Sequence, residues 1–365
     1  MSTSSSTRLP FVDALKALAS QLIVLHHLAF YGPMSDAAHE LAPALIGWLS
    51  EHGRLAVQVF LAMGGFLAAR TLAPRGRLSA DDALGLVWRR YVKLVVPYVT
   101  ALAVAICCSA LVRMWMEHHS VPHAPSVLQL LAHGLLLHDL LGYEALSAGI
   151  WYIAIDFQLF ALTVALLWLG RHAAPRALRG RYLGPVLLAV AAGASLFYFN
   201  RDATWDVSAL YFVGAYGLGA LCYWAAGRGR SLLWLALLGV VVAAALALDF
   251  RVRIGVALAT ALALGIARRH NVLERWPDVR PIALLGRISY SVFLVHFPVC
   301  LAVNALFFRI VGDDPAANLA GMLAAWAAST AAGAMFHRLI EAPAREIRVV
   351  APWRRAKQGQ DSAIA

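Results

Sequence analysis

Hydrophobic residues occur along this chain in long blocks, separated by shorter segments that carry most of the charges. Each block has roughly 20 residues, enough for a helix to cross the roughly 30 Å apolar core of a bilayer. The pattern therefore predicts an all-α fold, a polytopic membrane helix bundle. Ten transmembrane helices are predicted, at residues 11–31, 54–73, 91–112, 150–169, 183–200, 207–226, 231–249, 252–267, 282–310 and 318–340.

One further apolar stretch, 127–141, carries His133 and His138 and is short for a span. Its length of about 15 residues is typical of a re-entrant or interfacial segment. If it does not cross, all basic clusters fall on one side of the membrane, as expected of cytoplasmic loops. If it crosses, the basic loop at 171–181 moves to the outside. We therefore expect 127–141 to dip in from the outer side, with both termini cytoplasmic.

The composition agrees with this class and excludes others. Of the 365 residues, 61% are hydrophobic and 14% are charged, whereas an average soluble domain is about 45–50% apolar and about 25% charged. The net charge of +11 comes without a basic face on a soluble domain, so we expect no nucleic-acid binding. It is typical of cytoplasmic loops that contact membrane lipids. The four cysteines lie inside apolar runs without ligand spacing, so we expect neither a disulfide nor a metal site.

The first predicted span places two ionisable side chains on one helix face. Lys16 and His27 are eleven residues apart, which is about three turns and about 16 Å along the axis. Ionisable groups at membrane depth are costly and are functional candidates by default. Alternatively, Lys16 extends to the inner head groups and His27 caps the helix at the outer interface. The spacing does not decide between the two interpretations.

A second group of candidates, Arg90 and Lys93, stands at the start of the third span, three residues apart on one helix face. The positive-inside rule alone accounts for basic residues there. The functional alternative is a clamp for a multiply charged phosphate group.

The segment from Trp151 to Phe160 contains two polar residues in an otherwise apolar span, Asp156 and Gln158. A carboxylate at this depth is costly without a partner, so we expect a histidine, arginine or lysine beside Asp156. For Gln158 we expect ordinary hydrogen bonding between helices.

Further polar residues lie in two later blocks and are expected to bind substrate or to be structural. The block from Gly286 to Pro298 reads as a polar interior helix face, and a second block closes the tenth span. The candidates are Arg287, Ser289, Tyr290, His296 and Glu341. Gly64-Gly65-Phe66 is interpreted as a small-residue helix contact or break rather than a nucleotide-binding loop.

Taken together, these blocks resemble the acyltransferase family 3 of membrane-embedded O-acyltransferases, which acylate bacterial surface sugars and related acceptors. Their order and spacing carry the resemblance, which extends from Arg8 to Arg345. The matching positions are Lys16 with His27, Gly65-Phe66, Arg90 with Lys93, Trp151 to Gln158, Gly286 to Pro298, and Glu341 with Pro343 and Arg345. The chain departs from the family pattern at Lys16 and Lys93, where arginine is usual, at Asp156, where glutamate is common, and at Gly64, where serine is common.

The resemblance implies an acyltransferase domain over 1–345, followed by a basic cytoplasmic tail over 346–365, in a bacterial inner membrane. It implies transfer of an acyl group, expected to be acetyl, from cytoplasmic acyl-CoA to a hydroxyl of a carbohydrate or glycoside acceptor on the outer side. Acyl-CoA is then a substrate, and we expect no permanently bound cofactor.

The spacing of the candidates fits a mechanism for this reaction. The phosphates of the donor would rest on Lys16, Arg90 and Lys93, with the pantetheine arm extending along the first span. His27 is then the expected general base, and Asp156 would orient it or stabilise its imidazolium form. His26, about 100° away around the helix, is the competing base.

Two other classes stay open. A transporter or flippase with Lys16, Asp156 and His296 along its path would explain the intramembrane charges equally well. It would not explain a basic clamp and a histidine about 16 Å apart on one helix. A structural membrane scaffold predicts that changes at His27 have no effect.

Overall fold

The structure, a computed structural model, describes residues 8–173, 182–227, 229–347 and 349. Within these residues the chain is helical and contains no strand. The helices at the predicted spans are α1 (Pro10–Phe30), α4 (Ala56–Leu72), α5 (Ala83–Val112), α7 (Ile150–Ala173), α8 (Leu183–Phe197), α9 (Ala209–Ala225), α10 (Leu233–Leu248), α11 (Val252–Arg269), α13 (Arg280–Ile310) and α14 (Pro315–Phe336).

Shorter helices connect or cap these elements. They are α2 (Pro33–Ala38), α3 (Pro43–His52), α6 (Val127–Gly134), α12 (Val272–Arg275) and α15 (Ala342–Glu346). Short 3-10 turns occupy Gly53–Leu55, Phe199–Arg201 and Ala203–Trp205, and a π-helical turn, His337–Glu341, joins α14 to α15. Nearly all of the predicted tail, 346–365, lies outside the described residues.

Seven segments are long and apolar enough to cross a membrane, which makes this an integral membrane protein. They are Pro10–Phe30, Pro43–Leu72, Ala83–Val112, Trp151–Ala173, Leu183–Arg201, Arg280–Ile310 and Pro315–Glu346. α9 and α10 are apolar but shorter, and α11 carries Arg253, Arg268 and Arg269 among its 18 residues. Every predicted span thus coincides with a helix, whereas ten crossings and the side of each terminus remain predictions.

The third span begins earlier than the hydrophobic pattern predicts. α5 starts at Ala83 instead of residue 91, because the Asp82 carboxylate accepts a hydrogen bond of 2.8 Å from the Gly85 backbone N–H and caps the helix. The helix then continues through Pro97 to Val112. This extra length places Arg90 inside a continuous helix rather than in a loop.

The ambiguous segment 127–141 forms only the eight-residue helix α6 and a following turn. A helix of this length measures about 12 Å, too short to cross a bilayer. Its leucines are exposed, among them Leu128 and Leu131, while His133 and His138 are fully buried beneath it. This pattern agrees with an interfacial segment.

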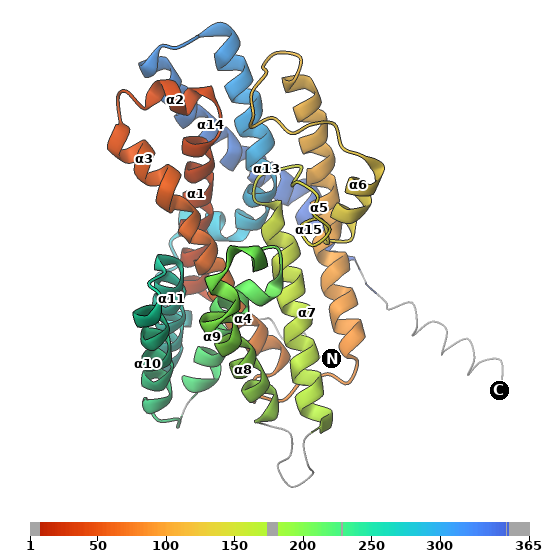
Figure 1. Cartoon of the computed structure of the whole chain (residues 1–365), viewed down its shortest axis with the longest axis vertical. Coiled ribbons are helices and arrows are strands. Elements are labelled where there is room, and N and C mark those ends of the chain that lie inside the picture. Colours follow the sequence, from red (N-terminus) through yellow and green to blue (C-terminus); the bar gives the residue numbers. More distant parts are fainter. Residues whose placement is uncertain (1–7, 174–181, 228, 348, 350–365) are drawn as a thin grey trace, which may run out of the picture.

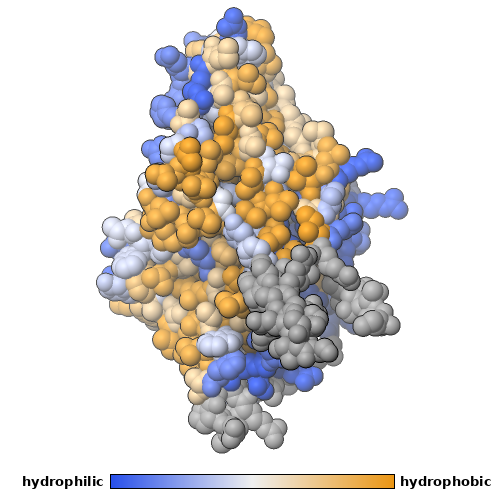
Figure 2. Space-filling view, turned by 90° about the vertical axis from the view of Figure 1, so that its right-hand side faces the viewer, coloured by the Kyte–Doolittle hydropathy of each residue, from blue (hydrophilic) through white to orange (hydrophobic). Residues whose placement is uncertain are grey.

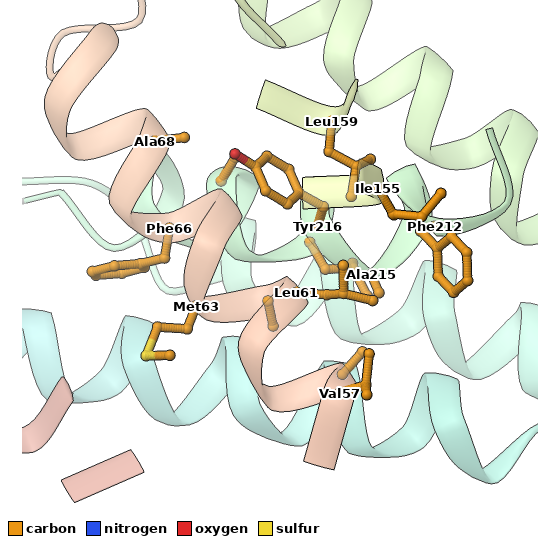
Figure 3. Close-up of a cluster of buried hydrophobic side chains, with 14 of the residues drawn as sticks. Val57, Leu61, Met63, Phe66, Ala68, Ile155, Leu159, Phe212, Ala215 and Tyr216 are labelled. Carbon is orange, nitrogen blue, oxygen red and sulfur yellow. The ribbon is translucent and has the colours of Figure 1, made fainter. Parts of the chain in front are cut away.

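The core beneath the site is built by α4, α7 and α9, whose side chains meet in Figure 3. Gly65 of α4 lies so close to α9 that a Cβ there would stand 1.8 Å from the Tyr216 carbonyl oxygen. Gly219 of α9 lies equally close to α4, because a Cβ added there would stand 1.7 Å from the Ala62 carbonyl oxygen. Small residues allow this close backbone approach, so the interpretation of Gly64-Gly65 as a helix contact is confirmed.

Most helices run along the long axis, with α5 and α7 on one side and α10 and α11 on the other (Figure 1). α13 packs between α1 and α14. Gly286 of α13 meets the Asp13 backbone of α1, which brings the Gly286–Pro298 block against the first span. On the face in Figure 2, hydrophobic residues cover most of the surface and hydrophilic residues gather near its ends and along one side.

Candidate active site

Two histidines from distant parts of the sequence form a buried pair. His27 of α1 and His296 of α13 lie with Nδ1 of the former 2.5 Å from Nε2 of the latter. Their rings are nearly parallel, with centroids 4.8 Å apart. His27 is 7% exposed and His296 is not exposed. The close packing of α1 on α13 brings these two rings together.

His27 also forms part of the wall of a cavity that has a volume of about 850 Å³. This size is within the range of small-molecule sites. Its wall combines aromatic rings with polar groups from the loops on either side of α6. Residues in this wall include His26, Phe30, Tyr31, Glu51, Arg54, His119, His123, Gln129, Glu144, Ser147, Trp151 and Phe293.

The competing histidine, His26, has a different environment. Its Nδ1 lies 3.0 Å from the Leu49 carbonyl oxygen of α3, so the ring donates a hydrogen bond to the backbone. Gly53 packs directly on its Cβ. His26 lines the same cavity, but its contacts tie it to the α3 segment rather than to His296.

Asp156 has the basic partner that the sequence analysis expects, and that partner is Arg90. The guanidinium Nη2 donates a 2.5 Å hydrogen bond to the Asp156 carboxylate. The expected contact between Asp156 and His27 is wrong, because no hydrogen bond or ion pair joins them within the described chain. His296 occupies the place beside His27, since α1 packs on α13 more extensively than on α7.

A second cluster surrounds this ion pair on the side of Lys16. Lys16 is half-buried, lies within electrostatic range of Arg90 and Glu341, and has no hydrogen bond or ion pair of its own among the described residues. Tyr290 lies within range of Arg90, Asp156 and Glu341, and donates a hydrogen bond to the Leu94 carbonyl oxygen. The structure thus brings Lys16, Arg90, Asp156, Tyr290 and Glu341 into one polar cluster inside the bundle.

Glu341 is the most heavily partnered of these groups. It is 2% exposed and accepts hydrogen bonds from Ser291 at 2.5 Å, from His337 at 2.9 Å and from Arg345. It lies in a π-helical turn, a local distortion that is frequent at functional sites. The bond from Ser291 joins the turn after α14 to α13, whereas the bonds from His337 and Arg345 lie within that turn and α15.

The remaining candidates, Lys93, Arg287, Ser289 and Gln158, do not line the cavity. Lys93 and Arg287 are exposed, and the Ser289 hydroxyl donates to the Gly286 carbonyl oxygen of its own helix. Gln158 accepts a hydrogen bond from the Ala209 backbone and donates a long one to Leu136, so it bridges elements as expected.

Aromatic rings stand between the polar cluster and the histidine pair. Tyr152 lies within electrostatic range of Asp156 and packs edge-on against Phe293 at 5.5 Å. Phe293 in turn lies 6.1 Å from the His296 ring, and Phe60 packs against both Tyr152 and Phe293. The two polar regions are therefore separate but adjacent.

Sequence reasoning did not identify the cavity residues contributed by the loops, notably Arg54, His119, His123 and Glu144. The unusual number of histidines between residues 118 and 138 is the signal that could have drawn attention to this region. Within the described residues, no group of three or more His, Cys, Asp or Glu side chains could hold a metal ion.

Comparison with protein families matches residues 9–337 to a family described as acyltransferase domain. Comparisons with curated proteins and with solved structures found no match. The match covers the helices that supply both histidines, the Arg90–Asp156 pair and Lys16. The chain is an acyltransferase and belongs to acyltransferase family 3.

Proposed function

We propose that this protein transfers an acyl group, expected to be acetyl, from cytoplasmic acyl-CoA to a hydroxyl of a carbohydrate or glycoside acceptor on the outer side of the membrane. The observation that carries the proposal is the placement of His27. It is a buried imidazole whose Nδ1 bonds His296, whose Nε2 has no partner in the described chain, and which lines the cavity.

The general-base step follows from this placement. Nε2 of His27 accepts the proton of the acceptor hydroxyl as its oxygen attacks the thioester carbonyl carbon. The new carbon–oxygen bond forms, the carbon–sulfur bond breaks, and the imidazolium proton goes to the departing thiolate. His27 returns to its neutral form, so the reaction consumes no proton overall. A base of this kind contributes about 10²–10⁴-fold to the rate.

The donor side is supported by Lys16, which forms no ion pair within the described part of the chain. Asp13 and Glu341 lie within electrostatic range of its ammonium, and a lysine ammonium suits a phosphate group. Lys16 and His27 lie on one continuous helix about 16 Å apart. Arg90 lies within electrostatic range of Lys16, and its Nε is buried and lacks a hydrogen-bond partner within the described chain. We assign the donor phosphates to Lys16 and Arg90, with Lys93 at the exposed entrance.

The acceptor side is supported by the composition of the cavity wall. Trp151 and Tyr31 offer flat apolar faces, and Glu144 and Gln129 offer hydrogen-bonding groups. Pockets of this kind orient a ligand through a few polar groups among apolar ones, which suits a hydroxyl-rich glycoside.

The test is transfer of radiolabel in sealed vesicles of known orientation. Labelled acetyl-CoA is supplied on the face that carries the 73–82 loop, and a glycoside acceptor on the opposite face. We expect labelled acceptor and free CoA in equal amounts, and no product when the donor is supplied on the other face. Movement of an unmodified solute without CoA release would instead support the transporter alternative and contradict the proposal.

A further inference from the structure

We propose that His296 is a positioning residue that holds His27 in the tautomer protonated on Nδ1, so that the lone pair of Nε2 is available to the acceptor hydroxyl. This inference rests on the proposed function, because it assigns a second residue to the same catalytic step. It follows from the hydrogen bonds of the two rings.

The backbone of α13 determines where the proton of His296 lies. Its Nδ1 is 2.8 Å from the carbonyl oxygen of Phe293 and 3.1 Å from that of Val292. Carbonyl oxygens only accept hydrogen bonds, so Nδ1 must carry the proton. In a neutral imidazole the other nitrogen, Nε2, is then an acceptor.

The proton of His27 is assigned by the same reasoning. Its Nδ1 lies 2.5 Å from the Nε2 acceptor of His296, so Nδ1 is the donor. The remaining nitrogen of His27, Nε2, therefore carries a lone pair and no proton. This is the state that a general base needs before it meets its substrate.

The opposite arrangement requires a charged His296. Only an imidazolium could donate from both nitrogens, and His27 would then need its proton on Nε2, where it could not act as a base. The His296 ring is fully buried, and no carboxylate contacts either ring within the described chain. Burying a charge without a partner is strongly unfavourable, so the neutral pair is the stable state.

The packing around His296 keeps its ring in this orientation. A Cβ added at Gly333 of α14 would stand 2.3 Å from a Val292 side-chain carbon, so α14 packs directly on the turn below the histidine. The ring of Phe293 lies 6.1 Å from that of His296, and the two histidine rings lie 5° from parallel. A ring held this closely presents the same nitrogen to His27 throughout turnover.

Three variants separate this role from simple packing. In His296→Gln the side-chain oxygen lies as many bonds from Cβ as Nε2 does, so it can accept the proton of His27. In His296→Asn the oxygen is one bond shorter and matches Nδ1 instead. His296→Leu fills the space and removes both groups.

We expect His296→Leu and His296→Asn to lower kcat by roughly 100-fold, with KM for acetyl-CoA unchanged within about threefold. His296→Gln should stay within about tenfold of the parent protein. Nitrogen-15 spectra of histidine-labelled protein, assigned by comparison with His27→Ala, should show an unprotonated Nε2 at His27 in the parent and a mixture of tautomers in His296→Leu.

Each variant must elute as a monodisperse species with the thermal midpoint of the parent, and His296→Asn alone decides the test if His296→Leu does not fold. The proposal is overturned if folded His296→Asn keeps the kcat of the parent, or if the tautomer of His27 is the same in all variants. If His27→Ala is inactive in the same assay, either of these results rejects the role of His296 but not the proposed function. Full activity of His27→Ala would instead remove the proposed function itself.

Discussion

At the scale of single residues, the ion pair between Arg90 and Asp156 shows how one carboxylate can serve the site without touching the base. The side chain of Asp156 is 10% exposed, whereas that of Arg90 is 39% exposed. The pair therefore fixes one end of Arg90 inside the bundle, where its Nε is buried as well, while part of the side chain stays exposed. In the proposed mechanism, Asp156 acts by holding Arg90 toward the donor.

A double-mutant cycle measures this coupling. We expect Asp156→Asn and Arg90→Gln each to lower the thermal midpoint, because each leaves a charge without its partner. The coupling energy should be about 1–2 kcal/mol, below the 3–5 kcal/mol typical of breaking fully buried pairs, because Arg90 is partly exposed. Thermal unfolding of the two single variants and the double variant checks this. Strictly additive effects would show that the two side chains do not depend on each other.

The sequence placed candidate residues on their helices more reliably than it predicted the contacts between those residues. Lys16 and His27 were correctly placed on one helix because a period of 3.6 residues is a local property. The partner of His27 depends on how α1 packs on α13, a contact across 269 residues of sequence. Intramembrane charge alone shows that Asp156 needs a cation, but not which cation supplies it.

At the scale of helices, the contact between α4 and α9 positions the α7 face that carries Asp156. Gly65 leaves no space for a side chain, because its added Cβ would stand 1.8 Å from the Tyr216 carbonyl oxygen. Tyr216 in turn packs in the core shared with α7, as Figure 3 shows. A change in the spacing of α4 and α9 would therefore be transmitted to the ion pair.

Gly65→Ala tests this contact, with Gly193→Ala as the matched control. Because the helices must separate to admit the methyl group, we expect Gly65→Ala to cost about 1–3 kcal/mol or more. Gly193 of α8 has no atom within 4 Å of an added Cβ, so its substitution should be neutral or slightly stabilising. Thermal midpoints of the purified proteins in one detergent give the comparison. Equal midpoints would mean that the α4–α9 contact is not close.

The turn after α6 contains a half-buried carboxyl group, Asp139. Burial and the nearby charge of Asp206 raise the pKa of Asp139 to about 6, above its ordinary value of about 3.9. The folded protein therefore binds more protons than the unfolded chain between about pH 4 and pH 6. For this group the contribution to stability is fully present below pH 4 and is lost as the pH rises through 6.

The variant Asp139→Asn should remove this pH-dependent loss of stability. Relative to the parent, its free energy of unfolding, followed by the thermal midpoint, should rise progressively between pH 4 and pH 6 and then stay constant. Asp313→Asn, at an exposed carboxylate in another loop, is the control. A difference between Asp139→Asn and the parent that does not change with pH would contradict the assignment.

Element types were predictable because long apolar blocks admit one regular structure in a membrane. Helix boundaries were harder to predict. α5 begins eight residues earlier than expected, because its capping residue, Asp82, lies in a polar segment that a hydropathy pattern does not assign to a span. The short helix α6 followed from its length, but the burial of His133 and His138 beneath it depends on tertiary packing.

At the scale of the whole molecule, two polar regions lie next to each other inside an otherwise apolar bundle. One contains Lys16, Arg90 and Asp156, and the other is the cavity lined by His27. α1 passes through both regions and supplies a basic group to each. This arrangement suits a transfer reaction between a donor and an acceptor that never share one aqueous compartment.

The most direct test of this account is the rate of acetyl transfer from acetyl-CoA to a glycoside by His27→Ala and by its neighbour variant His26→Ala. Both must show the elution profile and thermal midpoint of the parent. We predict that His27→Ala loses about 10²–10⁴-fold in kcat, whereas His26→Ala, whose ring bonds the α3 backbone, retains kcat within about tenfold. Full activity of folded His27→Ala, or loss of activity in His26→Ala alone, would contradict the assignment of His27 as the base.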